Sequence, residues 1–130
     1  MDIIKISEHE FPTILAITAE EQEKGLMFQP WPPPIMTFVY SQPSVNKFWM
    51  KNTQSPLDIL FCFSGQIIAI ENGEPHSTKI IGDNRLSDLV IELPSGTCTA
   101  HDIRMGNNVE LKCSQSSLMK IFMRKNGLLI

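Results

Sequence analysis

The sequence lacks the features that would place the protein in a membrane or direct it to export. No apolar run reaches the roughly 18 residues that a spanning helix needs. The first residues, 1–6, contain no basic segment followed by a long apolar stretch, which argues against a signal peptide. We therefore expect a soluble, cytoplasmic protein that does not contact a membrane.

An excess of positive charge is also lacking. The formal net charge is −3, and the 11 Lys and Arg residues are spread along the chain. Proteins that bind nucleic acids usually gather basic residues into a patch or stripe. The composition therefore predicts that nucleic acid is not a partner.

Cysteine and histidine are scarce, with three residues of each. Cys62, Cys98 and Cys113 show no Cys-x-x-Cys spacing, so neither a zinc knuckle nor a redox motif is indicated. No His-x-His or Glu-x-x-His spacing supports a metal site. The chain also has no Gly-x-Gly and no Gly-x-Ser-x-Gly, which are signals for phosphate loops and hydrolase nucleophiles. We predict no metal and no cofactor.

Short segments rich in β-branched and aromatic residues make up most of the chain. Nine prolines and seven glycines divide these segments. The predicted strands are 3–6, 13–17, 35–40, 47–50, 58–63, 66–71, 88–93 and 108–113. Ser64 and Gly65 form a tight-hairpin signal between two of them. The pattern predicts one domain over residues 1–130, an all-β, mainly antiparallel and compact fold of the sandwich or barrel-like type.

One or two short helices are expected within this fold. Thr18 and Glu21 have the spacing of a capping box, and Gly25 can end a helix over residues 19–24. A second short helix is predicted at 97–103. A C-terminal extension of about 114–130 fits either a helix or a turn between strands. Its last three residues are apolar, so we expect them to pack on the sheet or to join an oligomer interface.

The most unusual run is Phe-Trp-Met-Lys-Asn-Thr at residues 48–53, which is followed by Pro56, Leu57 and Asp58. Asp58 begins a strand that is otherwise apolar. A carboxylate there must be paired, hydrogen-bonded or directed into a cleft, because burying it without a partner is costly. Asp58 is therefore the most informative single residue of the sequence.

These segments carry a resemblance to a known family. Residues 25–27 (Gly-Leu-Met) after the acidic helix, the 48–53 run, residues 56–58 (Pro-Leu-Asp) and residues 91–96 (Ile-Glu-Leu-Pro-Ser-Gly) occur in this order. Together they resemble domain of unknown function 192, a family of small bacterial, archaeal and phage proteins, over about 13–111. The resemblance implies an all-β fold with one or two short helices. It implies no substrate, cofactor or catalytic residue, and a phage-encoded member would act in the host cytoplasm.

The candidate ligand pocket is drawn from the unusual run and its surroundings. It comprises Met27, Trp49, Met50, Lys51, Asn52, Thr53 and Asp58. Tryptophan and methionine can line an apolar small-molecule pocket, although such residues in strands more commonly form the core. Asp58 and Lys51 can form an acid–base pair or hold a polar ligand. Alternatively, Asp58 accepts hydrogen bonds from the amides of the 52–55 turn and holds its shape.

The leading functional hypothesis is a non-catalytic accessory module that binds a small molecule or a protein partner. One alternative is a small enzyme that uses Asp58 with Lys51 in acid–base or hydrolytic chemistry. Another is a structural or assembly protein, in which the Trp-Pro-Pro-Pro segment at 31–34 and the apolar tail make the contacts. We expect a monomer or a small homo-oligomer.

Overall fold

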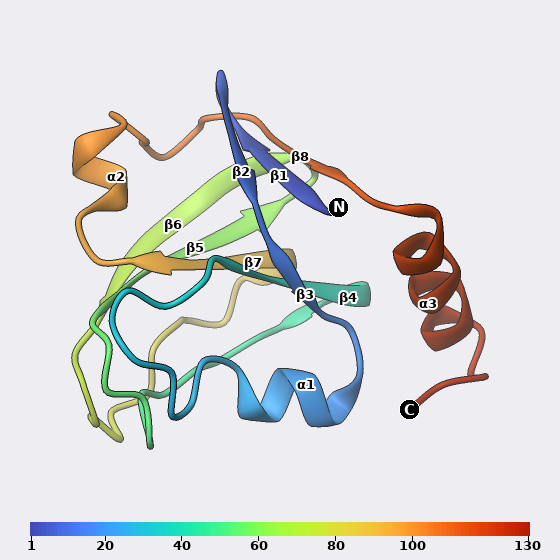
Figure 1. The fold of residues 1–130 in the computed structure, drawn as a ribbon, viewed down its shortest axis with the longest axis horizontal. Coiled ribbons are helices and arrows are strands. Elements are labelled where there is room, and N and C mark those ends of the chain that lie inside the picture. The colour runs from blue at the N-terminus through green and yellow to red at the C-terminus, as the bar shows by residue number, and fades with distance from the viewer.

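Two β-sheets and three helices make up the computed structural model, which describes residues 1–130 (Figure 1). The larger sheet has five strands and the smaller has three. All strand pairs but one are antiparallel. The predicted all-β fold class is confirmed.

The smaller sheet has the strand order β2-β1-β8. Its strands are β1 (Ile3–Ile6), β2 (His9–Pro12) and β8 (Val109–Lys112). The sequence predicted no strand between residues 6 and 13. Residues 9–12 form β2 because Ser7 adopts a positive φ of 54° and turns the chain back along the free edge of β1.

The larger sheet has the strand order β3-β4-β7-β5-β6, so β7 is its central strand. Its strands are β3 (Ile14–Ala16), β4 (Met36–Val45), β5 (Leu57–Phe63), β6 (Gln66–Gly73) and β7 (Leu86–Pro94). The β3–β4 pair is the parallel one. Ser64 and Gly65, both with positive φ, make the predicted hairpin turn between β5 and β6.

The predicted strand at 47–50 is wrong. Only Phe48 makes a β-bridge, to Ile81, and the rest of the segment is a connection without strand pairing. Two of the bulky residues that suggested a strand, Phe48 and Met50, contribute to the core instead. Met50 is completely buried in the core, while Trp49 is 44% exposed.

Three helices flank the sheets. They are α1 (Ala19–Lys24), α2 (Thr97–Ala100) and α3 (Gln115–Lys125). α1 has the predicted capping box, in which Thr18 Oγ1 accepts from the Glu21 amide and the Glu21 carboxylate accepts from the Thr18 amide. α2 is shorter than predicted, because the chain turns at residues 101–102, where Asp102 has a φ of 53°. α3 occupies the segment whose structure the sequence left open.

A hydrophobic core lies on each face of the larger sheet. Successive strand residues point to opposite faces, so neighbours on β5 belong to different cores. Leu60 and Cys62 pack with Ile4 and Ile6 of β1, and this core lies between the two sheets. The core on the opposite face takes residues from all five strands of the larger sheet and from two connections. They are Ala16, Leu26, Met36, Phe38, Met50, Leu57, Ile59, Phe61, Ala69 and Val90.

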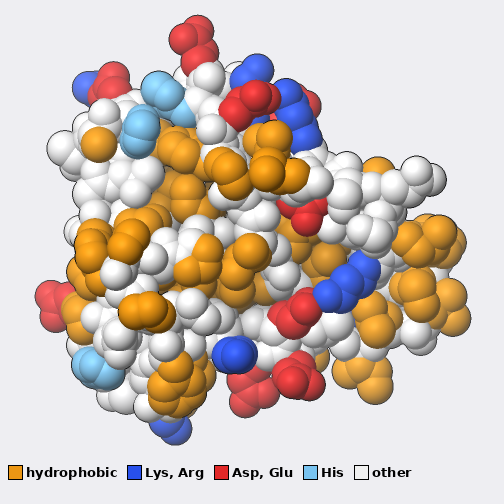
Figure 2. Space-filling model, viewed as in Figure 1, with side chains coloured by type: hydrophobic (Ala, Val, Ile, Leu, Met, Phe, Trp, Pro, Cys, Tyr) orange, Lys and Arg blue, Asp and Glu red, His pale blue; other side chains and the backbone are white.

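α3 lies at one side of the domain (Figure 1). Polar contacts attach it there. Asp2 accepts hydrogen bonds from the Ser114 amide and the Ser117 hydroxyl at its first turn. No residue of α3 is fully buried. Leu118, Met119 and Phe122 are its exposed apolar side chains. Figure 2 shows hydrophobic surface on the right, where α3 lies. In the apolar tail, Leu128 and Ile130 are exposed and Leu129 is partly buried. A role of this tail in an oligomer interface stays a prediction.

Candidate functional site

Glu92 lies in the middle of the larger sheet. It is on the central strand β7, paired with Met36 of β4 on one side and Ile59 of β5 on the other. Met36 and Ile59 belong to the core on the α1 side of the sheet, and Glu92 points to the same face. Only 4% of the residue is exposed.

The Glu92 carboxyl has no partner within the protein. Burial raises its pKa to about 8, and no hydrogen bond or positive charge of the chain opposes this shift. Every completely buried side-chain oxygen of the protein has a hydrogen-bond partner. Because the Glu92 oxygens have none, they are not completely enclosed and retain access to open space. A buried acid without a donor is costly, so Glu92 does not stabilise the fold and is a candidate functional residue.

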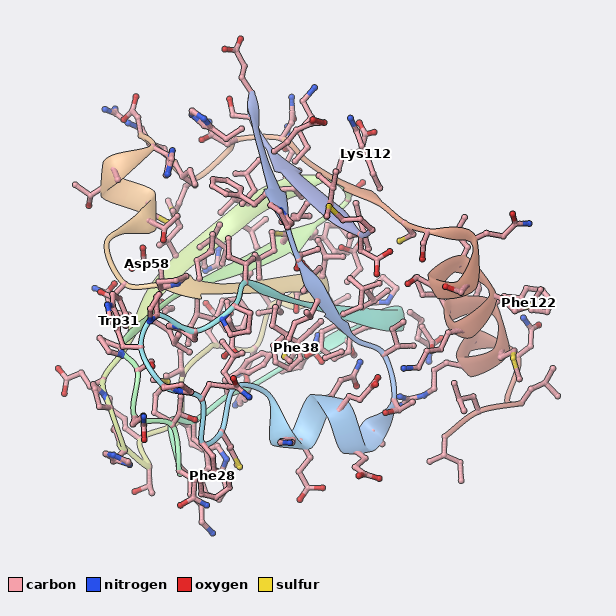
Figure 3. All side chains as sticks on the ribbon, viewed as in Figure 1. Phe28, Trp31, Phe38, Asp58, Lys112 and Phe122 are labelled. Carbon is pink, nitrogen blue, oxygen red and sulfur yellow. The ribbon has the colours of Figure 1, made fainter.

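The open space is a cavity of about 370 Å³ between the larger sheet, α1 and the connections that follow α1 and β4. Four aromatic residues contribute to its wall: Phe38, Tyr40, Phe48 and Trp49. The Phe38 and Phe48 rings meet edge to face, with centroids 5.0 Å apart. In Figure 3, Phe38 lies between the larger sheet and α1. Burial and the nearby Glu92 carboxylate raise the pKa of Tyr40, so its hydroxyl is neutral.

Gly25 keeps the space next to Glu92 open. Its amide donates to the Glu21 carbonyl and ends α1, with φ at 50° and ψ at −131°. A Cβ at this position would come within 3.4 Å of Phe38 Cζ and 3.7 Å of Glu92 Oε1. Glycine therefore serves two purposes here, since it adopts a conformation that L side chains avoid and adds no atom to the cavity.

Charged side chains surround the mouth of the cavity. Glu23, Lys24 and Lys47 line it and are exposed. A shallow depression beside the cavity shares Met27 and Trp49 with it, and there Lys51 Nζ lies 5.2 Å from the centroid of the Trp49 ring. This is a cation–π contact on the rim of the site.

The structure separates the residues of the sequence-based candidate pocket. Met27, Trp49 and Thr53 line the cavity, and Lys51 and Asn52 line the adjacent depression. Met50 is in neither, because it is fully buried in the core, where its Sδ would lie 2.5 Å from a Cβ placed on Gly73.

Asp58 lies on the opposite face of the sheet from the cavity. Its register partner on β7 is Leu93, whose side chain belongs to the core between the sheets. Asp58 Oδ2 accepts a hydrogen bond of 3.0 Å from the Cys98 amide in α2, and Figure 3 shows Asp58 on the α2 side of the larger sheet. The expected hydrogen bonds from the 52–55 turn are not made. Lys51 is engaged with Trp49 and forms no ion pair with Asp58.

The sequence did not single out Glu92, nor Phe38 and Tyr40. Glu92 does fall within residues 91–96, one of the segments that carry the family resemblance. The signal that drew attention to Asp58 was equally present at Glu92, which interrupts the apolar run of residues 89–93. Both acids interrupt apolar strands, but Asp58 accepts a hydrogen bond from the protein and Glu92 does not.

Other groups of reactive side chains are small. No three His, Cys, Asp or Glu residues lie together as metal ligands would. The three cysteines are free. The fold brings His9 and His101 together, with ring centroids 5.0 Å apart, although they are distant in sequence. None of the helices combines the length and apolar character required to cross a lipid bilayer.

The fold and the cavity define a small two-sheet β protein with a recessed acidic site. The chain belongs to the domain of unknown function 192 family (DUF192), described as "Uncharacterized ACR", whose profile matches residues 3–111. The match begins ten residues before the expected start of the family region and ends before α3. No curated protein matches the chain.

Two solved structures are similar to this chain. A protein of unknown function from Novosphingobium aromaticivorans DSM 12444 shares 30% identity over 83% of each chain, with a TM-score of 0.77. A protein from Sinorhizobium meliloti 1021, described as "a putative transcription regulator", shares 32% identity. It aligns over 85% of this chain and 93% of its own, also with a TM-score of 0.77. The fold is therefore shared with relatives whose names state no ligand.

Proposed function

We propose that this chain is a small-molecule-binding module that takes up its ligand in the Glu92 cavity. One observation carries the proposal: a carboxyl group in the middle of the sheet, 4% exposed, has no partner in the protein and is adjacent to an open cavity. A ligand that supplies the missing partner would recover the free energy that its burial costs.

The dimensions and lining of the cavity support this proposal. Small-molecule sites commonly measure about 300–1,000 Å³ and combine apolar or aromatic walls with a few polar anchors. The cavity, at about 370 Å³, has aromatic residues in its wall and Glu92 inside. The Tyr40 hydroxyl is a second polar group near Glu92.

A binding role without catalysis fits the site better than the alternative hypothesis from the sequence, an acid–base enzyme that uses Asp58 with Lys51. Asp58 and the cavity lie on opposite faces of the sheet, so Asp58 and Lys51 do not converge on one ligand. Within the cavity, Glu92 makes no hydrogen bond to a nucleophile or base, which activated catalytic groups generally require.

A fragment screen monitored by backbone amide NMR shifts tests this proposal. The set should contain aromatic fragments bearing a cationic, a neutral polar or an anionic group. We expect hits that shift amides of residues 22–27, 45–49 and 92. Val45→Trp should block the mouth, because exposed Val45 lines it, and should weaken binding at least about tenfold, or 1.4 kcal/mol.

Ser41→Trp is the matched control, because Ser41 is exposed on the same strand and lies outside the cavity lining. This variant should bind the hits as the wild type does. The proposal fails if no fragment shifts the cavity amides at millimolar concentration. It also fails if the Val45 and Ser41 variants bind equally well.

A further inference from the structure

Glu92 differs from the other buried polar side chains because it makes no hydrogen bond within the protein. Asp58 accepts from a backbone amide, the Thr13 and Thr37 hydroxyls bond each other at 2.9 Å, and Ser87 bonds Asn46. Glu92 alone has no such contact. When the Glu92 carboxyl is ionised it can only accept, so a partner for the carboxylate must be a hydrogen-bond donor.

The walls around this carboxyl favour positive charge. Phe38, Tyr40, Phe48 and Trp49 line the same cavity, and the faces of aromatic rings attract cations. The ionised Glu92 carboxylate attracts an ammonium group and repels an anion, and the aromatic rings of the wall can contact such a cation. Trp49 already has a cation near its ring, the Lys51 ammonium at 5.2 Å.

The chain's own cations do not neutralise Glu92. Lys24 on α1 and Lys47 after β4 are exposed at the mouth, and neither forms an ion pair. The remaining ionisable groups of the lining are Tyr40 on β4 and Glu23 on α1, and neither carries a positive charge. On the β5 side the neighbour of Glu92 is Ile59, while Asp58 faces the other core.

We infer that the ligand inserts a protonated amine, which donates hydrogen bonds to Glu92 and lies among the aromatic rings of the cavity. This inference rests on the proposed function and specifies the chemical class of the ligand. The amine supplies the charge that no lysine of the chain supplies.

Binding of an ammonium group at Glu92 is coupled to the loss of a proton from this residue. An ammonium ligand requires the ionised carboxylate, whereas free Glu92 is mainly protonated below its pKa of about 8. Binding below this pH therefore releases a proton, and affinity rises about tenfold per pH unit up to about pH 8 before levelling off. A neutral ligand that accepts a hydrogen bond from protonated Glu92 would show the opposite dependence.

Titrations with benzylamine, benzyl alcohol and benzoate between pH 6 and pH 9 test the inference. The three probes share a ring and differ in charge. We expect benzylamine to bind in the cavity by amide NMR shifts, with affinity falling about tenfold per unit below pH 8. Glu92→Gln should lose at least about tenfold in affinity and remove the pH dependence.

Asp58→Asn is the matched control, because it neutralises another buried carboxyl of the same sheet, on the face opposite to the cavity and outside its lining. It should keep benzylamine affinity within about threefold of the wild type and retain the pH dependence. Thermal melting verifies that both variants are folded. The pH dependence of the wild type tests the inference without any substitution.

Several results would overturn the inference. One is binding of benzyl alcohol or benzoate at the cavity at least as tight as that of benzylamine. Another is benzylamine binding that Glu92→Gln or pH leaves unchanged. In either case the cavity would still bind a ligand, and the proposed function would stand. Failure of the whole fragment set, by contrast, would overturn the proposed function itself.

Discussion

Glu92 and Asp58 are two acids in neighbouring strands of one sheet, and their surroundings give them different roles. Asp58 accepts a hydrogen bond from the Cys98 amide and helps to hold α2 against the sheet. Glu92 receives nothing from the protein and is adjacent to a cavity. Stability accounts for the first residue, whereas the second is retained at a cost to stability.

The cost of Glu92 should appear in the pH dependence of stability. Its pKa rises from 4.5 to about 8 on folding because of burial. Between these values the unfolded chain releases the proton that the folded protein keeps, so the free energy of unfolding falls as pH rises. The loss approaches 1.4 kcal/mol per pH unit and stops above about pH 8.

The Glu92→Gln variant has no ionisable group at this position, so comparing its stability with that of the wild type isolates the contribution of Glu92. Thermal melts of both proteins at pH 5, 6, 7 and 8 should show the advantage of the variant growing steadily with pH. Other ionisable groups contribute equally to both proteins and cancel in the difference. Parallel melting curves across this range would contradict the account of Glu92 as a buried acid without a partner.

Asp58→Ala should act on stability alone. The substitution leaves the Cys98 amide without its acceptor and should lower the free energy of unfolding by about 1–3 kcal/mol. In a domain of this size the melting temperature should then fall by roughly 3–12 °C. Binding of the cavity fragments should not change, because Asp58 lies on the other face of the sheet.

Asp88→Ala is the control for Asp58. Asp88 Oδ2 also accepts one backbone amide, from Ser64, but this hydrogen bond is exposed to solvent. Its loss should cost less, because water can replace the acceptor. Differential scanning calorimetry measures both variants. Equal costs, or a loss of fragment affinity in Asp58→Ala, would show that the assigned role of Asp58 is wrong.

Among the helices, α1 and α3 are specified in different ways. α1 contains its own start and stop signals, the capping box of Thr18 and Glu21 and the terminal Gly25. α3 also has a local start signal, since Ser114 accepts from the Ser117 amide. Its position, however, depends on distant groups: Asp2, Glu21 and the Ile17 carbonyl all contact it.

A chain that ends at Cys113 should still fold. α3 has no fully buried residue, and the family match ends at residue 111. Removing it deletes the partly exposed Lys120–Glu21 ion pair and the hydrogen bond from Arg124 to the Ile17 carbonyl. Losing these contacts should lower the free energy of unfolding by about 2–4 kcal/mol.

Circular dichroism melts and amide NMR spectra of the shortened chain test this prediction. We expect a cooperative transition at a lower temperature and cavity amides at their wild-type shifts. A collapsed spectrum without shift dispersion would show that α3 is part of the folding unit rather than an addition to it.

At the scale of the whole molecule, the two faces of the larger sheet have different surroundings. One face packs on the smaller sheet and is closed by apolar side chains. The other combines a core with the Glu92 cavity beneath α1. A buried structural face and a partly open face allow a ligand to enter without disrupting the contact between the sheets.

Acidic and basic side chains are mixed on the face shown in Figure 2. The absence of a nucleic-acid partner, expected from the net charge of −3, stays a prediction. The description of the Sinorhizobium meliloti relative as a regulator concerns that protein. A ligand-binding role for this chain is compatible with many biological contexts, because a fold does not by itself dictate function.

Much of the fold was predictable because its signals are local. The capping box at Thr18, the Ser64-Gly65 hairpin and the apolar strands on both sides of it each lie within a few neighbouring residues. Two errors, the missed β2 and the false strand at 47–50, arose where pairing depends on a distant partner. The edge of β1 recruits residues 9–12, whereas residues 47–50 find only one bridge, from Phe48 to Ile81.

The candidate site was predictable only in part. The sequence by itself determined the family, the class of fold, α1 and most of the strands. It also drew attention to residues 48–53, several of which line the cavity or its rim. Only the tertiary structure decided that Glu92, rather than Asp58, is the acid without a partner. The environment of a strand residue depends on which element covers that face, and α1 and α2 come from distant parts of the chain.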